Sequence, residues 1–179
     1  MIDFFKMEEY FQAKLQRKKV LSLYLVIASL YFCGSIVVLI WYLTLPYMSP
    51  TITWVKVVQF SSTALFVVFS FVYLGIPFKR VNRYFKMTRN LATGLKESST
   101  GSFFEYSESL QEKDGVDFKN LIFLEWNKFK NDFFERKVLV YCEKEFPEFE
   151  KNANVRYVTQ GNVLVSYEIL DYKKEGEQE

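Results

Sequence analysis

Few residues in this chain have the types and spacing that catalysis requires. Histidine is absent, which removes the commonest general base and the commonest transition-metal ligand. The two cysteines, Cys33 and Cys142, are expected at different depths and cannot pair. The hydroxyl and carboxylate groups at residues 105–125 alternate as a solvated strand face would, and no nucleophile has a base beside it. We therefore expect no enzyme activity, no metal and no cofactor.

Binding is the chemistry that the sequence favours instead, around the last predicted turn of the chain. The candidate partner surface comprises Tyr157, Gln160, Asn162 and Tyr167. Aromatic rings beside a polar turn combine apolar area with hydrogen-bonding groups, which is typical of interaction hot spots. The alternative is that the apolar members fill the domain interior, because strands point half of their side chains inward.

Two long uncharged runs, residues 20–45 and 57–78, organise the rest of the chain. The hydrocarbon core of a bilayer is about 30 Å thick and an α-helix rises about 1.5 Å per residue, so roughly 20 apolar residues cross it. Pro46 and Pro50 lie between the runs and cannot continue a helix. The sequence therefore predicts a membrane α-helical hairpin over residues 20–78.

The basic residues flank both runs on one side. Lysines and arginines gather before residue 20 and after residue 78, whereas the link between the runs has only Lys56 at its border. By the positive-inside rule, this pattern predicts a multi-pass protein of the cell membrane with both termini in the cytoplasm. Trp41 and Trp54 stand near the link, where an outer aromatic belt is expected.

Small and hydroxylic residues mark one face of each predicted span. They are Ser29 and Cys33 in the first span and Gln59, Thr63 and Ser70 in the second. Such residues let helices approach closely and hydrogen-bond across, so we expect them between the two spans or between copies of the chain. Neither span contains a charged residue, which argues against an ion or proton pathway.

Two amphipathic helices are predicted beside the inner face of the membrane. Residues 1–19 form either an interfacial anchor or an extension of the first span that packs on the protein. Residues 79–97 continue a helical period opposite a basic face, which either binds anionic headgroups or is simply solvated. The basic face comprises Lys79, Arg80, Arg83, Lys86 and Arg89.

Residues 98–171 predict a small cytoplasmic all-β domain. The hydrophobic period changes from 3.6 to 2, and turn signals recur every 8–12 residues or so. This spacing favours an antiparallel barrel or sandwich of the SH3-like or OB-like kind. The polar stretch at residues 96–102 predicts a boundary, beyond which the domain folds by itself. Residues 172–179 are charged and are predicted to be a disordered tail.

The charge of the β domain bears on its partners. Residues 97–179 contain eleven basic and eighteen acidic residues, a net charge of −7, whereas residues 79–96 hold six basic residues and no acidic one. An acidic domain argues against nucleic acid. We expect an integral membrane protein that tethers a cytoplasmic β-barrel interaction or assembly module to the inner face of the membrane. Its partner would be a cytoplasmic or membrane protein, or further copies of itself.

An alternative function belongs to another class. Two spans followed by a cytoplasmic β-barrel are similar in layout to the membrane effectors of bacterial cyclic-nucleotide defence systems. That resemblance implies a ligand-sensing effector whose barrel binds a small molecule, such as a nucleotide, and oligomerises the transmembrane hairpins. The net charge of −7 disfavours an anionic ligand, so we prefer the tethering function.

Overall fold

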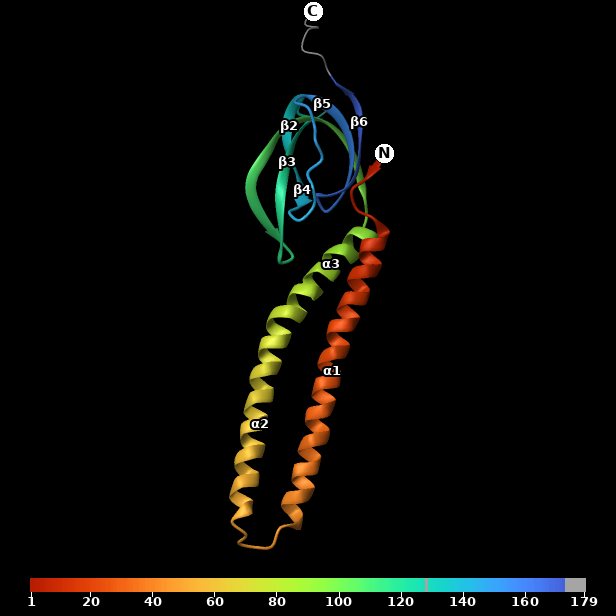
Figure 1. The fold of residues 1–179 in the computed structure, drawn as a ribbon. Coiled ribbons are helices and arrows are strands. Elements are labelled where there is room, and N and C mark those ends of the chain that lie inside the picture. The colour runs from red at the N-terminus through yellow and green to blue at the C-terminus, as the bar shows by residue number, and fades with distance from the viewer. Residues whose placement is uncertain (128, 173–179) are drawn as a thin grey trace, which may run out of the picture. The chain divides into compact units, whose positions relative to one another are not determined.

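The computed structural model describes residues 1–127 and 129–172 (Figure 1). Three α-helices precede the main strands: α1 (Met7–Thr44), α2 (Thr51–Tyr73) and α3 (Lys79–Thr93). A π-helical turn, Leu74–Phe78, joins α2 to α3 and contains Pro77. Because the proline has no N–H to donate, the backbone ladder is interrupted here, and the wider turn carries the helix past the interruption.

Two helical stretches are long and apolar enough to cross a membrane, which confirms that part of the prediction. One is α1, and the other runs from α2 through α3. In the most apolar window of each stretch, 6% and 0% of the residues are buried. Since a core helix of a water-soluble protein would be largely buried, these helices expose their apolar side chains instead of packing them inside the chain.

The chain divides into two compact units, and the division does not follow the sequence order. One unit comprises Ala13–Asn82 and holds most of α1 with all of α2. The other comprises Met1–Gln12 together with the chain from Arg83 onward. The first twelve residues therefore belong to the same unit as the strands.

The second unit is built on a six-stranded sheet. Its strands are β1 (Ile2–Asp3), β2 (Glu97–Lys113), β3 (Val116–Asn127), β4 (Asp132–Tyr141), β5 (Ala153–Gln160) and β6 (Val163–Tyr172). Antiparallel pairs join β2 to β3, β3 to β4, β5 to β6 and β2 to β5. The two-residue turn between β5 and β6 holds Gly161 and Asn162 at φ +52° and +67°, as a type I′ hairpin requires.

The sheet is mixed, whereas the sequence predicted an antiparallel one. β4 and β6 run parallel and meet at Leu139 and Val163. The long connection over residues 142–152 carries the chain from β4 to β5, which pairs with β2, and β6 then returns beside β4. Each of β2 to β5 thus has two neighbours and β6 has three, and Figure 1 shows these strands curving around a common interior.

The N-terminal segment differs from the predicted helix over residues 1–19. Ile2 and Asp3 form β1 against Tyr167 and Ser166 of β6, and α1 begins only at Met7. Phe5 is buried in an apolar cluster on the outer face of the sheet, which we call the outer cluster. Its members are Phe5, Met87, Leu91, Phe118, Leu139, Val163 and Val165. The pairing of β1 with β6 and the burial of Phe5 favour an extended segment on the sheet over a helix on the membrane surface.

The polar stretch predicted as a boundary lies inside β2. Residues 97–102 pair with residues 154–159 of β5. Glu97 and Ser99 reach toward an interior arginine, Arg136, so their polarity serves a contact inside the domain. Residues 173–179 of the predicted tail lie outside the described residues.

Candidate functional site

A polar cluster occupies one end of the domain interior. Arg136 of β4 donates to Ser99 Oγ at 2.7 Å, to Glu97 Oε2 at 2.7 Å and to Glu125 Oε1 at 3.3 Å. Alternate residues of a strand share a face, and the neighbours on this face, Phe123 and Val138, are fully buried. The side chains of Arg136 and Glu125 are only 15% and 12% exposed. β2 and β3 therefore direct polar groups to one guanidinium, which β4 carries.

Tyr157 completes this cluster from β5. Its hydroxyl donates to Glu125 Oε1, and its ring centroid lies 5.9 Å from the Arg136 guanidinium carbon. Burial and the hydrogen bond to Glu125 raise the pKa of Tyr157 far above its usual range, so the hydroxyl keeps its proton. Burial lowers the pKa of Arg136, but the hydrogen bond to Glu97 and the Glu125 charge raise it by more. The cluster is a set of satisfied ion pairs and hydrogen bonds.

The structure corrects the candidate partner surface at Tyr157. Its side chain is 0% exposed, because it belongs to the interior, and it cannot contact a partner. Tyr167 is half-buried, with its ring 5.1 Å from that of Phe149. Gln160 is half-buried beside a small cavity of about 90 Å³, and only Asn162 is exposed. The last turn is therefore mostly packed against its own domain.

A group of exposed aromatic residues lies at another turn, which the sequence reasoning missed. Trp126, Phe133 and Phe134 are 47%, 59% and 42% exposed, and Phe129 is fully exposed. We call these four residues at the tip of the β3–β4 hairpin the aromatic ribbon. A signal was present in the sequence, because two consecutive aromatic residues on a strand must point to opposite faces.

The tip of the aromatic ribbon is ordered by local hydrogen bonds. Asn127 Oδ1 accepts from the N–H of Phe129 at 2.9 Å and of Lys130 at 3.3 Å. Across the hairpin, the rings of Trp126 and Phe133 meet edge to face with centroids 4.9 Å apart. Because the rings are held before any partner arrives, less conformational entropy is lost on binding.

The predicted basic face of α3 is partly used inside the unit. Lys79, Arg80, Lys86 and Arg89 are exposed. Arg83 is half-buried and donates to the Gly115 carbonyl at 3.4 Å, in the turn between β2 and β3. The opposite face of α3 is buried in the outer cluster through Met87 and Leu91. From Arg83 onward, α3 therefore belongs to the β unit.

The interface between α1 and α2 uses only part of the predicted set. Gln59 Nε2 donates to Ser35 Oγ at 3.2 Å, the hydroxyls of Tyr31 and Thr63 are 2.8 Å apart, and Tyr24 donates to Ser70 Oγ at 3.2 Å. The predicted residues of α2 thus contact α1.

The predicted residues of α1 lie elsewhere. Ser29 and Cys33 are exposed, whereas Ala28 is buried. The face that meets α2 repeats at Tyr24, Ala28, Tyr31 and Ser35, at intervals of three and four residues. The hydroxyls of Tyr24 and Tyr31 make the hydrogen bonds to α2 that small residues of α1 were expected to make. The interface therefore lies on a different face of α1 from the predicted one.

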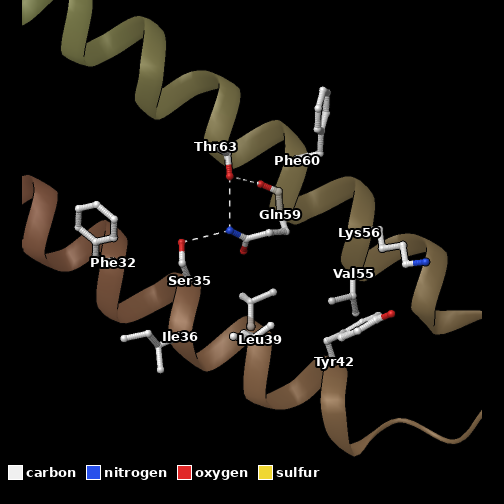
Figure 2. A pocket seen from close by; sticks show the side chains of 11 residues that line it. Phe32, Ser35, Ile36, Leu39, Tyr42, Val55, Lys56, Gln59, Phe60 and Thr63 are labelled. Carbon is white, nitrogen blue, oxygen red and sulfur yellow. Dashed lines mark hydrogen bonds between the residues drawn. The ribbon is translucent and has the colours of Figure 1, made fainter.

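A groove opens between α1 and α2 at the end of the helix pair nearest the link (Figure 2). Its volume is about 630 Å³. Lining residues are Phe32, Ser35, Ile36, Val38, Leu39, Tyr42, Val55, Lys56, Gln59, Phe60 and Thr63. The groove is mostly apolar and has polar groups on Lys56, Gln59 and Ser35.

The described residues contain no group of three histidine, cysteine, aspartate or glutamate side chains placed to hold a metal ion. Cys33 and Cys142 are both free thiols. Burial raises the pKa of Cys142, which disfavours its thiolate. No protein-family model matches the chain, and no curated protein and no solved structure matches it.

Proposed function

We propose that this chain is a two-pass membrane protein that holds a β-barrel interaction module at the inner face of the membrane. The observation that carries the proposal is the exposed aromatic ribbon on a domain fastened to both ends of the spanning segment. Phe5 precedes α1, Met87 follows α2, and both pack in the outer cluster. Both ends of the spanning segment therefore lead into the same domain.

The shared unit also supports the proposed topology. Residues 1–12 pack with the strands, so the N-terminus and the β domain lie on one side of the membrane. An even number of spans is then required, and two apolar helical stretches supply it. The positive-inside pattern places this side in the cytoplasm.

The topology can be tested with single cysteines on a background of Cys33→Ser and Cys142→Ala. Tyr47→Cys lies in the link and Leu95→Cys follows α3, and both positions are more than nine-tenths exposed. A membrane-impermeant maleimide is expected to label position 47 in intact cells and position 95 only after the inner membrane is opened. Labelling of both positions from the same side would contradict the two-pass arrangement.

The strand pairings support a barrel rather than a sandwich. The neighbours run β2, β3, β4, β6, β5 and back to β2, and the parallel pair is β4 with β6, the third and fifth of these strands in chain order. Among the two barrel types predicted, this connectivity favours the OB-like one. OB-fold barrels bind oligonucleotides and oligosaccharides on the face formed by their second and third strands. The corresponding strands here are β3 and β4, which carry the aromatic ribbon.

A protein is the partner that the surroundings of the aromatic ribbon favour. Aromatic residues are enriched at protein–protein interfaces. The net charge of −7 over residues 97–179 disfavours nucleic acid.

The aromatic ribbon can be tested in membranes by photo-crosslinking. A photoreactive phenylalanine analogue at position 129 is expected to form covalent adducts with protein. The same analogue at Leu110, an exposed apolar residue elsewhere on the domain, is the matched control and should form none. Phe133→Ser should weaken binding roughly thirtyfold if the ring contributes about 2 kcal/mol as a hot spot. Absence of protein adducts at position 129 would contradict the interaction function.

The ligand-sensing effector is the second candidate, and the interior cluster is the observation that favours it. Arg136 could reach a ligand only by giving up Glu97 or Glu125, its present carboxylate partners. Ser99 and Thr159 add hydroxyl groups beside it. A hydrogen-bonding molecule that replaces these contacts would enter the barrel at this end and could alter the strands that hold the helices.

A further inference from the structure

We infer that the groove between α1 and α2 binds an anionic phospholipid of the outer leaflet. The inference rests on the proposed two-pass topology, which places the link and this end of the groove at the outer face. It adds a ligand site to a segment that the proposed function uses only as an anchor.

The groove has the size and the walls that an acyl chain needs. Its volume of about 630 Å³ lies within the range of small-molecule sites, roughly 300–1,000 Å³. Its apolar lining includes Phe32, Ile36 and Leu39 of α1 and Val55 and Phe60 of α2. Figure 2 shows Leu39 and Val55 between the two helices, with Lys56 at the end toward the link. Hydrocarbon can therefore lie along the walls while a polar headgroup stays near Lys56.

The charge of Lys56 selects an anion. Lys56 is the only charged residue from Val20 to Phe78. Its ammonium lies 5.8 Å from the ring centroid of Tyr42, and it makes no ion pair with any residue in the described part of the chain. An ammonium at headgroup depth without a counter-ion attracts a phosphate group, with an expected preference of about fivefold for an anionic over a zwitterionic lipid.

Gln59 offers a second polar contact one helical turn from Lys56. Its amide nitrogen donates to Ser35 Oγ and to Thr63 Oγ1, but its carboxamide oxygen accepts no hydrogen bond from residues 1–127 or 129–172. An acceptor left without a donor beside hydrocarbon is unfavourable. The hydroxyls of a phosphatidylglycerol headgroup would supply the donor while the phosphate meets Lys56.

A second copy of the chain fits this groove less well than a lipid. The spans contain no aspartate or glutamate between Val20 and Phe78, so a neighbouring copy has no acid within its spans to place against Lys56. A lipid brings both the hydrocarbon and the negative charge in one molecule.

Brominated lipids test the site, because bromine quenches tryptophan fluorescence on contact. Trp41 and Trp54 are next in sequence to the lining residues Tyr42 and Val55. In a Trp126→Phe variant, these two are the remaining tryptophans, so the fluorescence reports on the region of the groove. The full chain is placed in phosphatidylcholine vesicles that contain either brominated phosphatidylglycerol or brominated phosphatidylcholine. We expect half-maximal quenching at about fivefold lower mole fraction of the brominated phosphatidylglycerol.

Substitutions at Lys56 assign the preference to the site. Lys56→Gln should bring the ratio of the two lipids to about one, whereas Lys56→Arg should keep the preference, since it keeps the charge. Lys79→Gln, which removes an exposed charge after the second span, is the matched control and should keep it too.

Equal quenching by the two lipids in the natural sequence would overturn the inference and leave the proposed function standing. A preference that survives Lys56→Gln would also overturn it. If neither lipid quenched the tryptophans, the spans would lie outside the bilayer, and the proposed function would fail together with this site.

Discussion

A fragment of residues 98–172 is expected to aggregate when it is produced without the rest of the chain. Phe118, Leu139 and Val163 are at most 5% exposed on the outer face of the sheet. Phe5, Met87 and Leu91, which cover them, are missing from the fragment. Burial of a large apolar side chain contributes about 1.5–3 kcal/mol, so the loss of three is comparable with the entire stability of a typical domain, roughly 5–15 kcal/mol.

The matched control contains the residues that bury the outer face of the sheet but lacks the two spans. A permuted chain joins residues 83–172 through about ten glycine and serine residues to residues 1–12. This chain should be a soluble monomer with a β-type circular dichroism spectrum, and Phe5→Ala within it should lower the free energy of unfolding by about 3 kcal/mol or more. A soluble, folded 98–172 fragment would show that the N-terminus and α3 add little to the domain.

Replacement of Arg136 by alanine is expected to lower the free energy of unfolding by about 3 kcal/mol. The substitution leaves Glu125 nearly buried with only the Tyr157 hydroxyl to oppose its charge. Urea unfolding of the full chain in detergent micelles, followed by the fluorescence of Trp126 after Trp41→Phe and Trp54→Phe, measures the change.

Arg156→Ala is the control, because it removes an exposed arginine from another strand of the same domain. Arg156 pairs with Glu168 at 3.8 Å, and the two side chains are 52% and 40% exposed. Exposed pairs contribute little, so the loss should be at most about 0.5 kcal/mol. Equal losses for the two variants would mean that the interior cluster is solvated and adds no more than a surface pair.

Arg136→Lys separates the two candidate functions. Lysine keeps the charge but loses the planar fork that contacts Ser99, Glu97 and Glu125 together. If the barrel is a ligand sensor, a nucleotide that raises the unfolding temperature of the natural protein should lose that effect in Arg136→Lys. No such ligand effect is expected if the barrel is only an interaction module.

Local patterns were sufficient to predict the long apolar helices and a run of strands after them, but not β1. The lengths of the apolar runs predicted two long helices, and the change of period after residue 97 predicted the strands. The glycine and asparagine at positions 161 and 162 predicted the turn between β5 and β6, because both adopt positive φ at low cost.

The predictions that the structure corrects here concern residues whose contacts lie in distant parts of the chain. Tyr157 is equally compatible with a surface or an interior, and only the position of Glu125 on another strand decides for the interior. Glu97 and Ser99 resemble a linker until Arg136 is placed beside them. Phe5 has the spacing of an amphipathic helix, and its burial depends on Val163 and Val165 near the other end of the chain.

The pairing of β1 with β6 sets the order in which this protein can be made. Ile2 leaves the ribosome well before its partner Tyr167, because α1 to α3 and β2 to β5 lie between them. In the proposed two-pass arrangement, both apolar helices therefore enter the bilayer while Ile2 and Phe5 still lack their places on the sheet. The same arrangement requires Phe5 to stay on the side of the β domain, because a translocated Phe5 could not return to the outer cluster. Closure of the domain would thus follow insertion of the helices, and a chain whose helices insert the wrong way round would not complete its fold.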